Sequence, residues 1–243
     1  MASPSFAQSS ISPSKLRSDL YAFCPQINDQ STPSVISVLA SLLDRAIAKN
    51  ERIDGRRESA QCSGYGPWTD TRATRVFECS QRPDITVQAF LERIFRYARV
   101  APPIYVVAYV YIDRLCEILP GFRITRWNVH RLLITAVMVA SKFVEDTNYK
   151  NSYFAKVGGL STREMNDSEF EFLFLMGFRF HVNVSVFDSY CCHLEREVSI
   201  GGGYQIERSL WFMCGGELKS SEKAKNGSSS IHSNVLLDLV RIS

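Results

Sequence analysis

The stretch Arg126–Asp146, which reads RWNVHRLLITAVMVASKFVED, constrains this chain more than any other. Between Leu132 and Ala140 only Thr135 is polar, and neither glycine nor proline occurs from residue 127 to residue 157. An apolar run of this kind predicts a helix that is surrounded by protein on every side. Charged residues bound it at both ends, so it is too short to cross a membrane. We predict a buried central helix, with Lys142 directly after its buried part.

The composition is that of an ordinary folded protein. Of the 243 residues, 45% are hydrophobic and 22% are charged, and the formal net charge is +3. A chain of this length can bury a sizeable core. Its basic residues are scattered or form only short clusters, so we expect neither nucleic acid nor a membrane as a partner.

The seven cysteines do not form a metal-binding pattern. They include no CxxC pair and have no histidine at ligand spacing, so we expect no metal and no cofactor. The N-terminal residues are rich in Ser and Pro and lack the apolar segment of a secretory signal. We therefore expect reduced thiols and a location in the nucleus, the cytoplasm or both.

Four regions of the chain differ in pattern. Residues 1–30 are polar and turn-rich, which indicates a mobile N-terminal arm. Residues 31–82 contain a helix that begins at Pro33, followed by an irregular connection from residue 51. Residues 83–200 encode five helices, and residues 201–243 indicate a weakly structured C-terminal tail. Since strand patterns are almost absent, the sequence predicts an all-α fold.

Capping residues and helix breakers mark the boundaries of these five helices. A loop that contains Tyr149 and Tyr153 is expected between the third and fourth helices. The predicted boundaries are, in chain order, Thr86 as the first cap, Pro102-Pro103 and Pro120-Gly121 as the limits of the second helix, Thr125 or Asn128 as the third cap, Ser161 and Glu164 as a capping box that begins the fourth, Gly177 as its end, and Ser185 as the start of the fifth.

Two charged residues occupy unusual positions. Lys142 lies where the central helix leaves the core, and Glu169 falls on the apolar stripe of the fourth helix. In one interpretation, Lys142 extends past the core to solvent and Glu169 lies on a slightly rotated stripe. In the other, the two emerge together and bind the backbone of another protein, because lysine donates to carbonyls and glutamate accepts from N–H groups.

At this point the sequence resembles the cyclin box. The resemblance is carried by YIDR, which contains Tyr111, Asp113 and Arg114, then by ASKF with Lys142, and by Glu169 nine residues before Phe178. The amino-acid sequence of these segments is similar to that of the plant U-type (P-type) cyclins. The similarity extends over about residues 83–215. The resemblance implies a single five-helix cyclin box with an extra N-terminal helix and flexible termini.

The resemblance also implies a function. In cyclins, the residues that match Lys142 and Glu169 bind the backbone beside the αC helix of a cyclin-dependent serine/threonine kinase. That contact completes the Lys–Glu ion pair by which the kinase holds ATP, so the cyclin contributes no catalytic group. The resemblance implies a structural role for Tyr111, and the adjacent Asp113 and Arg114 are interpreted as an ion-pair clasp, or alternatively as ordinary helix-surface charges.

Other functions are less well supported by the residues. The sequence has none of the common nucleophile, phosphate-binding or zinc-protease motifs, so an enzyme is not expected. A scaffold that binds a kinase without activating it, or a transcription-related binding module with the same fold, stays open as an alternative. The first box helix lacks the MRAIL-like stretch with which cell-cycle cyclins dock substrates, so that docking site is not carried over.

Overall fold

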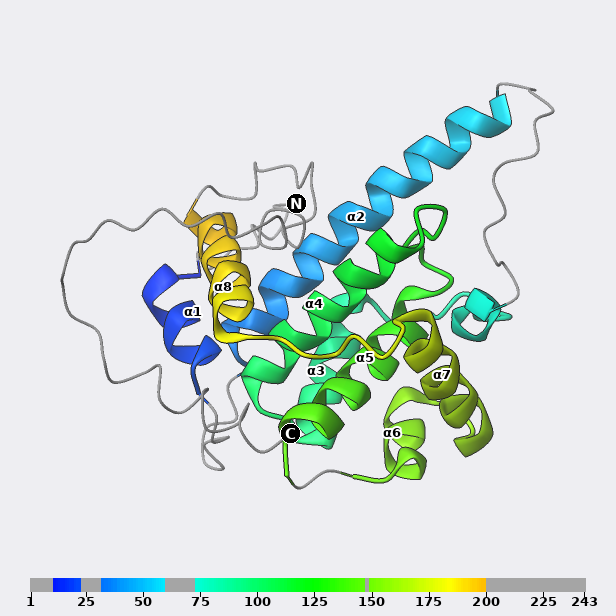
Figure 1. Ribbon diagram of the computed structural model, residues 1–243. Helices are drawn as coiled ribbons and strands as arrows, with labels where there is room; N and C mark the ends of the chain where they lie inside the picture. The colour runs from blue at the N-terminus through cyan, green and yellow to red at the C-terminus, as the bar shows by residue number, and fades with distance from the viewer. Residues whose placement is uncertain (1–10, 23–31, 60–72, 147–148, 200–243) are drawn as a thin grey trace, which may run out of the picture.

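A computed structural model describes residues 11–22, 32–59, 73–146 and 149–199 (Figure 1). Every regular element in these ranges is a helix, as the sequence predicts. No helix among them is long and apolar enough to span a membrane. The elements are α1 Pro13–Leu20, α2 Ser34–Ser59, the 3₁₀ helix η1 Ala73–Phe77, α3 Val87–Ala98, α4 Pro102–Ile118, α5 Val129–Val144, α6 Asn151–Gly158, α7 Thr162–Leu175 and α8 Val184–Ser199.

The predicted central helix is α5, and it is buried as expected. It packs most extensively against α4 and also contacts α3, α6, α7 and η1, so other helices surround it (Figure 1). Its residues from Val129 to Ser141 are buried apart from Arg131. The polar residues in this interior have partners: His130 Nε2 lies 2.9 Å from the carbonyl of Ile85, and Thr135 donates to the carbonyl of Arg131. Burial of α5 therefore leaves few unpaired polar groups.

Most helix boundaries follow the predicted signals. The Thr86 side chain accepts a hydrogen bond from the backbone N–H of Ala89, which caps α3. Two prolines begin α4, and the Ser161–Glu164 capping box begins α7 with both of its hydrogen bonds formed. Asn128 precedes α5 without capping it, because its side chain instead bonds the backbone of Arg123 and Thr125.

The structure corrects three expectations about the less regular regions. The arm predicted over residues 1–30 contains α1, whose Leu16 and Leu20 are fully buried against neighbours that include α8 and α2. The first long helix, α2, continues to Ser59, where an irregular connection was expected, and extends past the other helices (Figure 1). The predicted tyrosine loop contains α6, which buries Phe154 and Val157. The predicted tail, 201–243, lies outside the described residues.

Two of these elements, α1 and α6, are not predicted by the sequence pattern for the same physical reason. A short helix with two or three apolar residues has a weak periodic signal, and tertiary contacts stabilise it more than its own propensity does. The partner faces that cover Leu16 or Phe154 come from distant parts of the chain, and periodicity within one segment cannot reveal them.

Val139→Asp tests the burial of α5. Val139 is 1% exposed, so the new carboxylate would be buried without a partner, which costs several kcal/mol out of a typical total of about 5–15 kcal/mol. We expect loss of the cooperative thermal transition, measured by circular dichroism. Ser152→Asp, at an exposed position of α6, is the control and should melt like the wild type. An unchanged melting temperature for Val139→Asp would show that α5 is not buried in this way.

Candidate protein-binding site

Lys142 and Glu169 meet at the surface where α5 ends. Lys142 Nζ donates to Glu169 Oε1 at 2.6 Å and to Asn151 Oδ1 at 2.5 Å. Asn151 Nδ2 in turn donates to Glu169 Oε2 at 2.6 Å and to Asn166 Oδ1 at 2.8 Å. Lysine, asparagine and glutamate therefore form a closed network that joins α5, α6 and α7.

The network fixes the side chains without using all of their bonding capacity. The Lys142 ammonium has three N–H donors, of which two are used within the described residues. Each Glu169 carboxylate oxygen accepts one bond and has a second lone pair. The side chains are 28% and 19% exposed, respectively. The site can therefore offer another protein a positioned donor and a positioned acceptor.

A second ion pair sets the position of α7 on α5. Arg131, near the start of α5, donates to Glu164 Oε1 at 2.6 Å in the first turn of α7. Lys142 is eleven residues further along α5, a rise of about 16 Å, so two separate points on α5 hold α7, at Glu164 and at Glu169. The backbone N–H of Ser161, the Ser161 hydroxyl and Arg131 lower the pKa of Glu164 to about 2. Glu164 is thus an anion at neutral pH and serves to position the helix that carries Glu169.

Exposed phenylalanines flank the network. We call Phe143, Phe170, Phe174 and Phe178 the aromatic rim; each is between 51% and 60% exposed. Phe143 directly follows Lys142, and Phe170 directly follows Glu169. The rings of Phe170 and Phe174 lie 4.5 Å apart between centroids, and those of Phe174 and Phe178 lie 5.2 Å apart. Neighbouring exposed aromatic residues beside a polar pair are typical of a protein interface.

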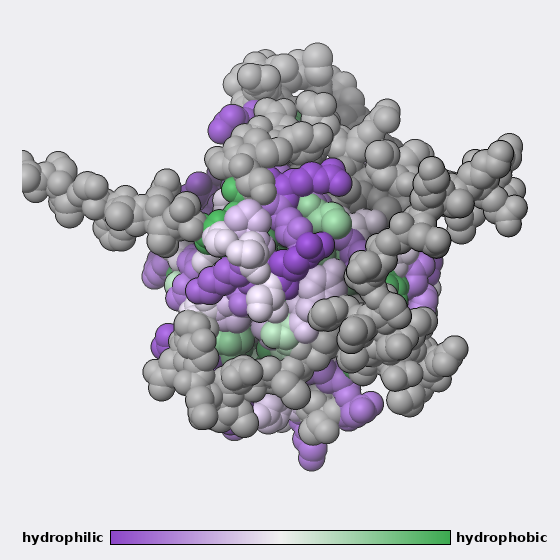
Figure 2. Space-filling model, turned by 90° about the vertical axis from the view of Figure 1, so that its left-hand side faces the viewer, coloured by the Kyte–Doolittle hydropathy of each residue, from purple (hydrophilic) through white to green (hydrophobic). Residues whose placement is uncertain are grey.

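The opposite side of the molecule has a different surface. On the face that carries α1 and α8, the described residues are mainly hydrophilic, with small separate hydrophobic areas (Figure 2). Among the described residues, none of the large exposed hydrophobic side chains lies on α1 or α8, so the aromatic rim is the stronger candidate for contact with a partner.

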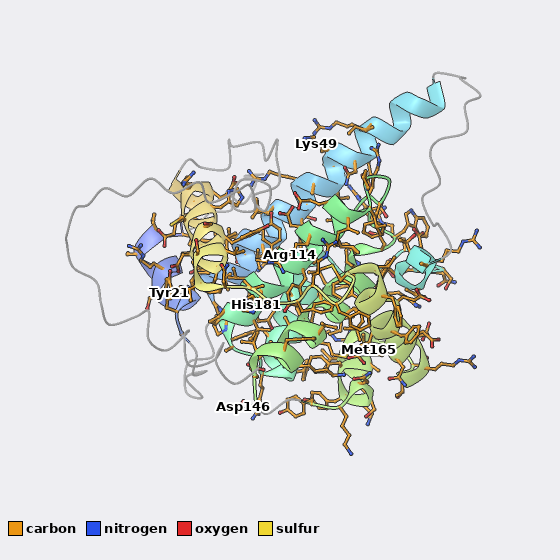
Figure 3. The ribbon with its side chains drawn as sticks, viewed as in Figure 1. Tyr21, Lys49, Arg114, Asp146, Met165 and His181 are labelled. Atoms are coloured by element: carbon orange, nitrogen blue, oxygen red, sulfur yellow. The ribbon has the colours of Figure 1, made fainter. Side chains whose placement is uncertain are left out.

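Side chains of α4 hold the segment that follows α7. Tyr111 donates to the carbonyl of Phe180 at 2.8 Å, and Arg114 Nη1 donates to those of Arg179 and His181 at 3.1 and 2.9 Å. Figure 3 shows Arg114 and His181 close together at this crossing. Three successive carbonyls are thus bound, and Phe180 is buried with its ring stacked against that of Phe143. Tyr111 and Arg114 lie behind the rim and support it.

The turn at the end of α7 places Phe178 outward. Gly177 and Phe178 both have positive φ, 55° and 57°, and the N–H of Phe178 donates to the carbonyl of Leu173, which closes the helix end. The left-handed conformation suits glycine but costs a residue with a Cβ about 1 kcal/mol or more. Strain of this kind is found at functional positions, and here it accompanies a 60% exposed phenylalanine.

Asp113 makes a different contact from the one expected. The expected Asp113–Arg114 ion pair does not occur among the ion pairs of the described residues. Asp113 Oδ2 instead accepts a hydrogen bond from the Tyr190 hydroxyl of α8 at 2.5 Å. Adjacent helix positions point about 100° apart, so the two side chains contact different neighbours. Burial together with the Asp113 charge raises the pKa of Tyr190.

Several residues of this site were missed by sequence analysis. Asn151 had no signal, because it lies in a helix that was expected to be a loop. The sequence does contain a signal for Phe170 and Phe174, which are four residues apart on α7. They lie off the buried stripe formed by Met165, Phe172 and Met176. Two large apolar residues on an outer face indicate a contact surface. Among the described residues, no group of histidine, cysteine and acidic side chains is placed to hold a metal.

Comparison with known proteins places these features in context. The family model described as Cyclin matches residues 33–180. The match thus includes α2 and ends before α8, whereas the box was expected at 83–200. Cyclin-U2-1 of Arabidopsis thaliana is 61% identical over 212 residues, which cover 87% of this chain and 90% of that protein. Cyclin-P2-1 of rice (Oryza sativa subsp. japonica) is 52% identical over 215 residues, covering 86% and 94%, respectively.

Glu164→Gln tests how α7 is held. The folded-state pKa of about 2 lies below the unfolded value of about 4.3, so the carboxylate stabilises the fold above about pH 4.3 and this contribution disappears as pH falls toward 2. We expect the variant to melt roughly 1–4 °C below the wild type at pH 7. The difference should vanish near pH 2, as followed by thermal melts across pH. Glu78→Gln, at an exposed position outside the capping box, is the control. A difference that is the same at every pH would rule out this role for the Glu164 charge.

Proposed function

The chain belongs to the cyclin family, whose members are regulatory subunits and not enzymes, and on that premise we propose that it binds and activates a cyclin-dependent serine/threonine kinase. The observation that supports this proposal most strongly is the Lys142–Asn151–Glu169 network beside the aromatic rim. In the proposed complex, Lys142 donates to a backbone carbonyl next to the kinase αC helix and Glu169 accepts from a backbone N–H there. The rim phenylalanines cover the apolar surface around these two contacts.

The energy required for activation can be compared with what this site offers. Moving a kinase from 1:99 to 99:1 in favour of the active conformation requires about 5.5 kcal/mol of differential binding. Two hydrogen bonds that involve charged groups contribute roughly 1.5–3 kcal/mol each. Full burial of a fully exposed phenylalanine contributes roughly 1.5–3 kcal/mol, and each rim side chain, at 51–60% exposure, has roughly half of that left to gain. The polar pair reaches the required amount only at the upper end of its range, so we propose that the rim supplies much of the binding energy while the pair fixes the position of αC.

The proposed mechanism needs no catalytic group from this chain. A kinase holds ATP phosphates with a lysine that is paired to a glutamate of αC. A partner that binds only the inward position of αC selects the conformation in which that pair forms. The two ion pairs between α7 and α5 keep Glu169 and Lys142 in place. The entropy cost of ordering these two side chains therefore arises when the cyclin folds, and it does not arise again when the kinase binds.

Lys142→Ala and Glu169→Ala test the polar pair. Each should weaken kinase binding by roughly 1.5–3 kcal/mol, about 10- to 150-fold, because the kinase backbone group that it bound is left buried and unpaired. The measurement is co-purification with candidate cyclin-dependent kinases, followed by titration of the captured kinase. Arg163→Ala, at a 92% exposed position of α7, is the control and should bind normally.

A phosphorylation assay with the same proteins tests activation separately. Wild-type protein should raise the activity of the captured kinase, and both alanine variants should raise it less at equal concentration. Binding without any rise in activity would assign the chain to the scaffold alternative. If both variants bind and activate like the wild type, the proposed role of the pair is wrong.

Phe178→Gly separates stability from binding. Glycine relieves the left-handed strain at this position, so we expect an equal or higher melting temperature, while loss of the exposed ring weakens kinase capture. Thermal melts and capture titrations on the same preparation give both values. Phe178→Leu keeps an apolar side chain and should bind better than the glycine variant. A glycine variant with lower stability and normal capture would contradict the account of the rim.

A further inference from the structure

A second surface of the molecule combines positive charge with exposed tyrosine. It is formed by the C-terminal part of α3 and by α6, which pack against each other. Arg93 Nη2 donates to the carbonyl of Lys156 at 3.4 Å, and the Tyr153 hydroxyl donates to the carbonyl of Tyr97 at 2.7 Å. These two contacts make the surface continuous. Its cations, all exposed, are Arg93, Arg96, Arg99, Lys150 and Lys156.

The charges of this surface are not neutralised within the described part of the chain. None of its five cations belongs to an ion pair there. Carboxylates on the same or adjoining segments are Glu92, which accepts from Gln88, Glu145, which accepts from the N–H of Ala101, and the exposed Asp146 after α5 (Figure 3). Five cations in one area contrast with a formal net charge of only +3 for the whole chain.

Tyrosine rings form a rigid platform among these cations. The rings of Tyr149 and Tyr153 are stacked, with centroids 4.2 Å apart, and the Tyr153 hydrogen bond ties the pair to α3. Tyr97 and Tyr149 are 52% and 40% exposed. Rigid aromatic side chains give contact area at low cost in conformational entropy, and tyrosine and arginine are enriched in binding surfaces.

The spacing of the cations favours an extended chain with several negative charges. The rise along the helix axis is about 4.5 Å from Arg93 to Arg96 in α3, and about 9 Å from Lys150, the residue before α6, to Lys156 within it. A single phosphate would need convergent donors, whereas an extended peptide advances about 3.3 Å per residue and can present a carboxylate to each cation in turn. A neighbouring apolar side chain of the peptide can then contact the exposed rings.

We propose that this surface docks an acidic peptide segment, a run of Asp and Glu with an aromatic residue, carried by a protein partner. The docking surface is distinct from the proposed kinase site. Helix α6 presents the Asn151 side chain to Lys142 and Glu169, and it presents the Tyr153 hydroxyl and the backbone carbonyl of Lys156 to α3. A partner segment can therefore be held while the Lys142–Glu169 site is occupied. The inference goes beyond the proposed function and does not depend on it.

The test is fluorescence anisotropy of a labelled peptide of Asp and Glu with one central Phe, titrated with the full chain. We expect binding that weakens as salt is raised, and no binding of the matched Asn/Gln peptide. The triple variant Arg96→Glu, Arg99→Glu, Lys156→Glu should lose about tenfold or more in affinity. The control triple variant Lys15→Glu, Arg75→Glu, Arg82→Glu changes the net charge equally at exposed positions elsewhere and should retain most of the affinity.

Several outcomes would overturn the proposal. An equal loss of peptide affinity in both triple variants would show that overall charge causes the binding. Absence of peptide binding to the wild type would directly refute the proposed docking role of this surface. Tighter binding of duplex DNA, or of vesicles containing phosphatidylserine, through the same residues would assign the surface to a different partner. Arg96→Gln, Arg99→Gln, Lys156→Gln with unchanged thermal melting excludes a folding defect. Since Lys142→Ala should leave peptide binding intact, failure here and failure of the kinase proposal are distinguishable.

Discussion

The burial of α5 on every side determines how the other helices of this protein are arranged. A helix that is apolar all round needs neighbours on all faces, and α3, α4, α6, α7 and η1 provide them. The Lys142 ammonium group at the end of α5 cannot be buried in the core, because burying an unpaired ion costs too much free energy. Lys142 therefore emerges in the last turn, where positive charge is also favoured by the helix dipole. Asn151 and Glu169 meet it there, so the core supports one partly exposed ammonium group.

The sequence allowed the framework to be predicted, because the framework follows local rules. Apolar periodicity identified α5, and the capping residues Thr86, Ser161 and Glu164 marked where α3 and α7 begin. Family resemblance paired Lys142 with Glu169, which are 27 residues apart. Periodicity alone left open whether Glu169 faces solvent.

The features that the sequence did not predict depend on contacts between distant segments, and local sequence patterns carry no information about such contacts. α1 is stabilised by residues far along the chain, such as Asp188, which accepts a hydrogen bond from Tyr21. Asn151 acquires its role only because α6 packs beside α7. Arg114 binds backbone carbonyls and not the neighbouring Asp113, because the chain after Gly177 places those carbonyls beside it. In each case the deciding partner lies in another element.

In the proposed complex, the Lys142–Glu169 face receives the kinase. Hydrogen–deuterium exchange of the chain, alone and with a captured cyclin-dependent kinase, tests it most directly because it reports on every segment at once. We expect slower exchange in the complex at the end of α5 and from residue 169 to residue 180, with α1 and α8 unchanged. Protection confined to α1 and α8, with the end of α5 and α7 unaffected, would contradict it.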